Sequence, residues 1–90
     1  MTNYVFKLFI AGKEGISLQA SKNLERFIRD SLNGAAQYEI IDILEVPDCA
    51  QEYKIIATPL LIRTDTQLIR KVIGDLSDWD KLKQGLGIEH

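Results

Sequence analysis

The chain has 90 residues, which is the size of one small domain, so we expect residues 1–90 to fold as a single unit. Its net charge of −2 argues against a nucleic-acid partner, which would favour a basic excess. No segment approaches the roughly 20 apolar residues of a membrane span, and Lys7 interrupts the apolar run near the start. We therefore expect no signal peptide, no membrane partner and a cytoplasmic protein.

The first half of the chain predicts a strand, a helix and a second strand. Residues 4–12 are apolar on both faces, which indicates a central strand covered on both sides. Residues 17–34 carry apolar side chains at helical spacing, with Ser17 as the expected N-cap and Gly34 as the C-terminal stop. Residues 38–46 follow as a strand, so this spacing predicts a βαβ unit with parallel strands.

A short helix and a hairpin are expected next. Pro47 fits the first position of a helix over residues 47–55. Residues 60–63 and 68–74 are apolar and indicate two strands, joined by a polar turn at Asp65.

The last helix is expected over residues 77–86. Ser77 and Asp80, three residues apart, have the form of a capping box. The element order is therefore βαβαββα, an α/β arrangement of the thioredoxin-like kind.

Few residues suit catalysis or metal binding. Thioredoxin-type redox chemistry needs a Cys-x-x-Cys at the start of the first helix, and residues 11–18 contain no cysteine. Cys49 leaves open a redox sensor or thiol protein, against the alternative that it fills a partly buried gap. His90, the one histidine, is the last residue and is a poor ligand or acid–base group. We expect no enzyme, no metal site and no cofactor.

Two charged features need an explanation. Asp42 stands in an apolar segment, and a buried carboxylate is costly unless it is paired or hydrogen-bonded. It either lies at a strand end, or pairs with a basic side chain such as Lys7, or shapes a binding surface. A basic stripe of Lys22, Arg26 and Arg29 follows one side of the first helix, most simply as a solvated face.

Four segments, read together, resemble the KaiB family. They are YVFKLFIAG, IIDILEVP, YKIIATPLL and RKVIGDLSD, and they follow one another from about residue 4 to residue 86. The resemblance implies a non-enzymatic regulator that binds the N-terminal ATPase ring of a KaiC-type hexamer, in circadian timing or stress adaptation. It also implies a second fold state, in which the free protein is a homodimer or homotetramer with the order βαββααβ.

The resemblance also implies site residues. Lys54 and Ile55 match the segment that contacts KaiC, Asp42 matches a strand aspartate of the family, and Pro59 is the expected cis proline. The residues expected in fold switching or helix capping are Gly74, Asp75, Ser77, Asp78 and Gly85.

The chain departs from the family in several places. Clock proteins of this family tend to carry a basic residue, which helps to hold KaiA, at the position of Glu39. The proline-rich loop of the family is replaced by residues 63–68, and we expect the chain to lack the family's acidic C-terminal tail. These differences leave KaiC binding expected and put KaiA binding in doubt. A KaiB–KaiC pair without KaiA, and the sensor domain of a clock-output histidine kinase, both stay open.

Overall fold

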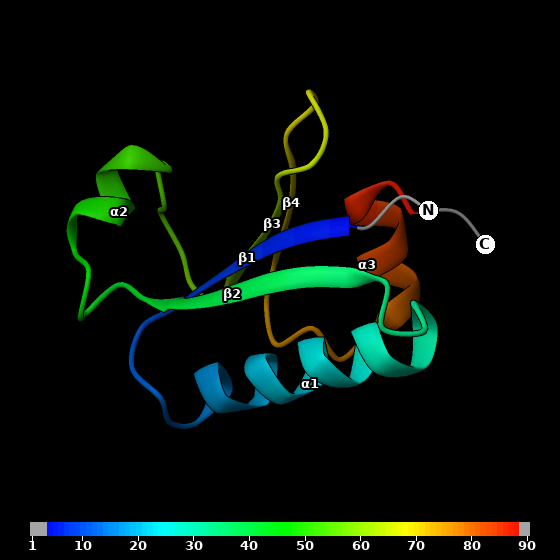
Figure 1. The fold of residues 1–90 in the computed structure, drawn as a ribbon. Helices are drawn as coiled ribbons and strands as arrows, with labels where there is room; N and C mark the ends of the chain where they lie inside the picture. Colours follow the sequence, from blue (N-terminus) through cyan, green and yellow to red (C-terminus); the bar gives the residue numbers. More distant parts are fainter. Residues whose placement is uncertain (1–3, 89–90) are drawn as a thin grey trace.

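The computed structural model describes residues 4–88, so the expectation about His90 lies outside the described part (Figure 1). The elements follow in the order β1 (Tyr4–Ile10), α1 (Ile16–Ser31), β2 (Ala36–Asp42), α2 (Asp48–Glu52), β3 (Leu60–Arg63), β4 (Arg70–Ile73) and α3 (Trp79–Leu86). This is the βαβαββα order that the sequence predicts. Across these residues, none of the helices has the length and apolar character needed to span a bilayer.

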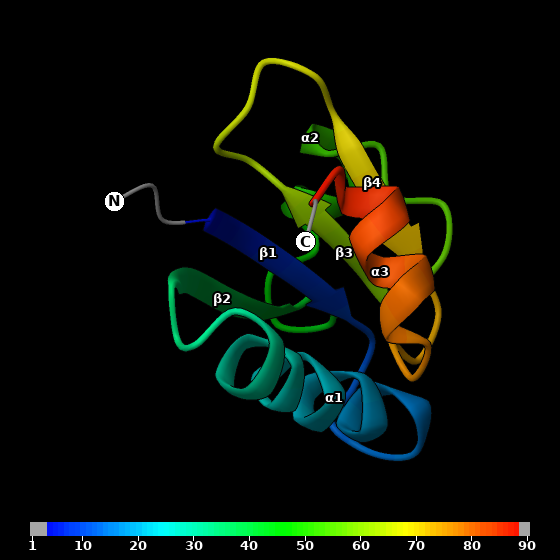
Figure 2. The ribbon, with the colours of Figure 1, turned by 90° about the vertical axis from the view of Figure 1, so that its right-hand side faces the viewer.

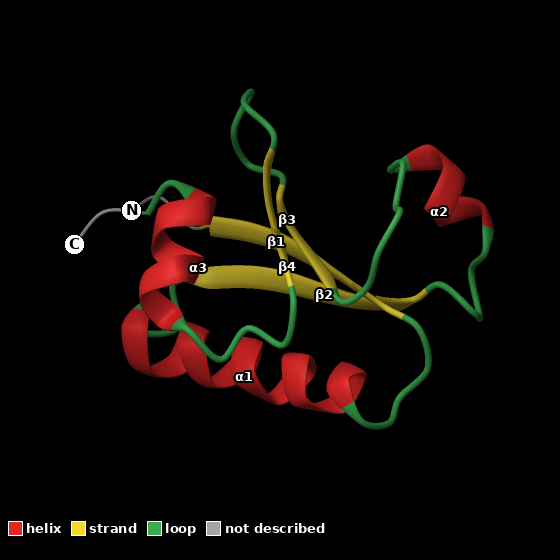
Figure 3. Ribbon diagram, turned by 180° about the vertical axis from the view of Figure 1, so that it is seen from behind, coloured by secondary structure: helices red, strands yellow, loops and turns green. Residues whose placement is uncertain are grey.

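The four strands form one sheet in the order β2-β1-β3-β4. β1 is parallel to β2 and antiparallel to β3, and β3 is antiparallel to β4, so the predicted βαβ unit and hairpin are both confirmed. α1 and α3 lie on one side of the sheet and α2 on the other (Figures 2 and 3).

Side chains of β1 divide the apolar core into two parts. Phe6, Leu8 and Ile10 face α1 and α3 in the larger cluster, whereas Phe9 faces α2 in the smaller one. Phe6, Leu8 and Phe9 are completely buried, and each such side chain stabilises the fold by about 1.5–3 kcal/mol. The expectation of a central strand covered on both sides is therefore confirmed.

The ends of three early elements differ from the prediction. β1 ends at Ile10 and β2 at Asp42, because residues 43–47 turn away from the sheet instead of continuing the strand. Ser17 is not the N-cap of α1. The helix begins at Ile16, and the buried Ser17 hydroxyl donates to the Ala11 carbonyl over 3.3 Å.

Three of the later assignments at helix ends are also wrong. Asp78, not Ser77, caps α3, since its carboxylate accepts from the Lys81 amide at 3.1 Å. Gly85 lies inside α3 and is not a cap, whereas Gly87 ends the helix in the left-handed region. Pro47 precedes α2 as its N-cap residue and is not its first helical residue.

Candidate interaction surface

The sheet face on the α2 side, which we name the α2 face, is only partly covered. Cross-strand pairing places Glu39, Lys7, Ile62 and Lys71 in one row from β2 to β4. The next row contains Phe9 and Leu60, which α2 buries with Cys49. Because α2 has five residues, it covers the second row and leaves Glu39 and Lys71 of the first row exposed. The uncovered part of this row therefore carries charged side chains of both signs.

Lys7 ties α2 to the sheet. Its Nζ donates to the Tyr53 hydroxyl at 3.0 Å and lies 3.7 Å from a carboxylate oxygen of Glu39. The hydrogen bond with Tyr53 raises the pKa of Lys7 above its ordinary value, although partial burial opposes the shift. Lys7 therefore stays charged and holds the C-terminal end of α2 against β1.

In the segment after α2, the two predicted contact residues lie in different surroundings. Lys54 has a left-handed backbone with φ 54° and an exposed side chain, whereas Ile55 is half-buried and packs into the smaller core. Ile56, which the sequence did not single out, is 94% exposed. The Thr58–Pro59 peptide bond is cis, which is the geometry that the resemblance implied for Pro59.

Asp42 lies at the end of β2 and not on the α2 face. Its carboxylate accepts hydrogen bonds from the amides of Gly12 at 3.0 Å and Leu44 at 2.9 Å. These two bonds hold the pKa of Asp42 below its ordinary value. The strand-end explanation is therefore confirmed and pairing with Lys7 is wrong. Glu39 is the acidic residue that pairs with Lys7.

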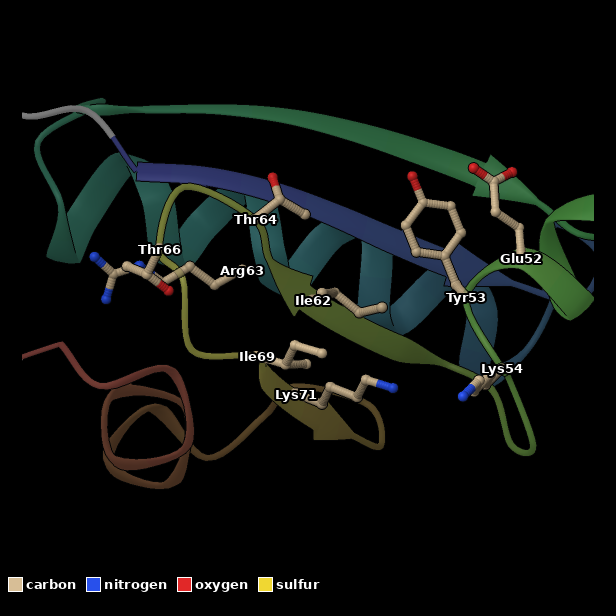
Figure 4. A pocket seen from close by; sticks show the side chains of 9 residues that line it. All are labelled: Glu52, Tyr53, Lys54, Ile62, Arg63, Thr64, Thr66, Ile69 and Lys71. Carbon is tan, nitrogen blue, oxygen red and sulfur yellow. The ribbon is translucent and has the colours of Figure 1, made fainter.

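A groove opens on the α2 face, between the end of α2 and the β3–β4 hairpin (Figure 4). Its volume is about 350 Å³, and we name it the α2 groove. In Figure 4, Tyr53 and Thr64 lie on one side of Ile62, and Ile69 and Lys71 on the other. The residues that line it are Glu52, Tyr53, Lys54, Ile62, Arg63, Thr64, Thr66, Ile69 and Lys71. Of the predicted contact residues, Lys54 alone lines this groove.

The Gly74–Asp78 signature lies apart from the α2 groove. Gly74 has φ 128° and its amide donates to the Pro59 carbonyl at 3.0 Å. Asp75 accepts from the Ser77 amide through its side chain and from the Asn23 side chain through its carbonyl. The signature thus fixes the connection from β4 to α3 and ties it to α1.

Cys49 does not present its thiol to solvent. It is 6% exposed and packs with Phe9, Leu60 and Ile62 under α2. This placement matches the gap-filling alternative, and the redox alternative is not favoured. Within residues 4–88, no three His, Cys, Asp or Glu side chains gather in a way that could hold a metal ion.

Comparisons with known proteins agree with the topology and with the four segments. A family model of the KaiB domain matches residues 7–88. The chain is 41% identical over 85 residues to the circadian clock oscillator protein KaiB of Rippkaea orientalis, which covers 94% of this chain and 82% of that protein. It is 40% identical over 85 residues to the circadian clock oscillator protein KaiB1 of Synechocystis, over 94% of this chain and 81% of that protein.

Solved structures show the same fold. Mitochondrial thioredoxin 3 from Saccharomyces cerevisiae has a TM-score of 0.73 at 20% identity, over 97% of this chain and 79% of that one. The N-terminal domain of Synechococcus elongatus SasA has a TM-score of 0.73 at 17% identity, over 93% of this chain and 83% of that one. At these identities the likeness establishes a thioredoxin-like fold and nothing about chemistry. With a family model matched over almost the whole chain and relatives at about 40% identity, the chain belongs to the KaiB family.

Proposed function

We propose that this chain is a clock regulator of the KaiB type, which acts by docking on a KaiC-type ATPase hexamer and catalyses nothing itself. The observation that carries the proposal is the match to circadian clock oscillator proteins over 94% of the chain. The expected docking target is the N-terminal ATPase ring, where the bound regulator would modulate the ATPase and phosphorylation cycle.

The α2 face supports docking through its exposed side chains. Lys54 extends from a left-handed turn and lines the α2 groove, and Ile56, two residues later, is 94% exposed. Ile69, which lines the groove, is also exposed, and exposed apolar side chains of this kind are typical of protein interfaces. The half-buried Ile55 contributes differently, because it supports the turn from beneath.

The family resemblance also bears on how the chain assembles. A free homodimer or homotetramer, with the βαββααβ order, stays a prediction from the family. We do not extend the proposal to KaiA, because the acidic Glu39 lies exposed on the edge strand β2, where a basic residue is usual in the clock proteins. A role in stress adaptation, in a system without KaiA, remains compatible with these features.

Size-exclusion chromatography tests the proposed function. The purified chain is incubated for hours with ATP and the KaiC-type ATPase of the same genome, and we expect it to co-elute with the hexamer. Lys54→Ala should weaken the complex while circular dichroism shows the fold unchanged, and Lys22→Ala, on the exposed side of α1, serves as the control. Failure to co-elute under every nucleotide and phosphorylation state would refute the proposal.

A further inference from the structure

The α2 groove has an apolar floor that suits a side chain of a partner. Ile62 is buried at 5% exposure and forms the base, while Ile69, which also lines the groove, is 74% exposed. Tyr53 is held in place by its hydrogen bond from Lys7. A volume of about 350 Å³ is at the lower end for small-ligand pockets, and it fits one or two apolar side chains.

The charges around this floor favour an acidic occupant. Arg63 is neutralised by Asp65 at 3.0 Å, so it adds little to the local field. Lys54 and Lys71 have no ion-pair or hydrogen-bond partner for their ammonium groups within the part of the chain that the structure describes. Glu52 is the one carboxylate that lines the groove. Two unneutralised cations therefore face one anion, on a chain whose net charge is −2.

Strand addition at β4 is a weaker alternative for this surface. Hydrogen bonds to β3 alternate along β4, and since the Gly74 amide bonds to Pro59, the carbonyl of Lys71 points away from β3. Gly85 of α3 approaches that carbonyl, because a Cβ on Gly85 would lie 3.7 Å from it. α3 therefore restricts this edge, and a partner has better access to the side chains of the groove.

We propose that the α2 groove binds an acidic segment of a protein partner, with one apolar side chain on Ile62 and Ile69 and carboxylates near Lys54 and Lys71. Where that segment belongs to the KaiC-type ATPase, the inference rests on the proposed function. Recognition of an apolar residue flanked by carboxylates does not depend on the proposed function.

Charge reversal in the complete complex is the first test. Lys71→Glu should weaken docking on the ATPase about tenfold or more, as reversal of a charge facing an oppositely charged partner does. Lys22→Glu makes the same charge change on the far side of the sheet and should leave docking unchanged. Raising the salt from about 0.1 M to about 0.5 M should weaken the wild-type complex and affect Lys71→Glu less. Equal docking by the two variants would overturn the inference but leave the proposed function intact.

A peptide titration tests the groove without the ATPase. The probe is a blocked peptide of alternating Glu and Leu, and its control is the same peptide with Gln in place of Glu. Under NMR we expect the acidic peptide to shift the amide signals of Tyr53, Ile69 and Lys71 in the wild type, and to lose this effect in Lys71→Glu. Equal binding of the neutral peptide, or shifts elsewhere on the surface, would overturn the inference. If the ATPase fails to bind the wild type while the acidic peptide maps to the groove, the proposed function fails and the inference stands.

Discussion

The substitution Gly85→Ala sets helix propensity against packing at the contact between α3 and β4. Ala is more favourable than Gly in a helix interior by about 0.8–1 kcal/mol. A Cβ on Gly85, however, would lie 2.6 Å from Cγ2 of Val72, far inside normal contact distance. Val72 is β-branched and half-buried in the core, so its rotation cannot relieve the overlap at low cost. Overpacking of this kind costs about 1–3 kcal/mol.

The difference between these two terms gives the expected result. Gly85→Ala should lower the free energy of unfolding by about 1 kcal/mol, which for a domain of this size is a fall in Tm of about 4–8 °C. The assay is urea and thermal unfolding at a concentration where sedimentation shows a monomer. In a Val72→Ala background the obstructing methyl groups are absent, so Gly85→Ala should become stabilising by about 0.5–1 kcal/mol.

The sign reversal between the two backgrounds is the decisive observation. Gln84→Ala, at the exposed neighbouring position of α3, is the control and should change stability by less than about 0.5 kcal/mol. If Gly85→Ala stabilises the wild type, or has the same effect with and without the Val72 side chain, the packing argument is refuted.

Three further predictions concern the polar contacts. Arg63→Met removes the hydrogen bonds that Arg63 donates to Asp65 and to carbonyls at the end of α3. Urea unfolding should therefore show a free energy of unfolding lower by about 1–3 kcal/mol at pH 7. Burial opposes ionisation of Asp65, but its hydrogen bonds hold its pKa below the ordinary value. The part of the loss that comes from Asp65 should therefore be present above pH about 4 and disappear as the pH falls through its native pKa, whereas the part from the α3 carbonyls should persist. A loss that does not become smaller in acid would contradict this. Asp42→Ala should speed hydrogen exchange of the Gly12 and Leu44 amides, which donate to its carboxylate. NMR titration of the wild type should give Asp42 a pKa below about 3.9, and an ordinary pKa would count against these hydrogen bonds. Tyr53→Phe should lower the pKa of Lys7 and reduce the free energy of unfolding by about 0.5–1 kcal/mol. This contribution should be present below the unfolded pKa of about 10.4 and lost as the pH rises through the native pKa. If the pKa of Lys7 does not change in the variant, Tyr53 does not stabilise its charged form.

Patterns that depend on one element alone were predictable from the sequence. The spacing of Ala20, Leu24 and Phe27 placed the buried face of α1, and alternation along β1 placed Phe6 and Phe9 on opposite sides of the sheet. Both follow from the periods of a helix and a strand, which are the same in every fold.

The element ends were less predictable, because neighbouring polar residues compete for the same role. Ser77 and Asp78 can both cap a helix, and the choice depends on which side chain meets a free amide; Asp78 does. Ser17 does not cap α1, because its buried hydroxyl donates to the Ala11 carbonyl. Local sequence does not encode these contacts between segments.

The site was predictable in part. The resemblance pointed to Lys54, but Ile62, Ile69 and Lys71 also line the α2 groove. Ile62 and Lys71 are paired by the register of the β3–β4 hairpin, and Ile69 lies just before β4. That register is set by the turn, and a shift of one residue would turn Lys71 to the opposite face. The polar turn after Arg63 was the available signal, and its exact pairing was not predictable from composition.

The unequal division of the core bears on the docking that we propose for the α2 face. Thirteen buried residues form the cluster beneath α1 and α3 in the described chain, whereas four form the cluster beneath α2. A helix of five residues is unstable by itself, so α2 depends on Cys49, on the support of Ile55 and on the bond between Lys7 and Tyr53. Segments with so few buried contacts open at lower free energy than the rest of a domain. If the proposed partner contacts Lys54, it binds the chain with α2 folded as described. Docking would then be coupled to the folding of α2, and a substitution that destabilises α2 would weaken docking without removing a contact with the partner.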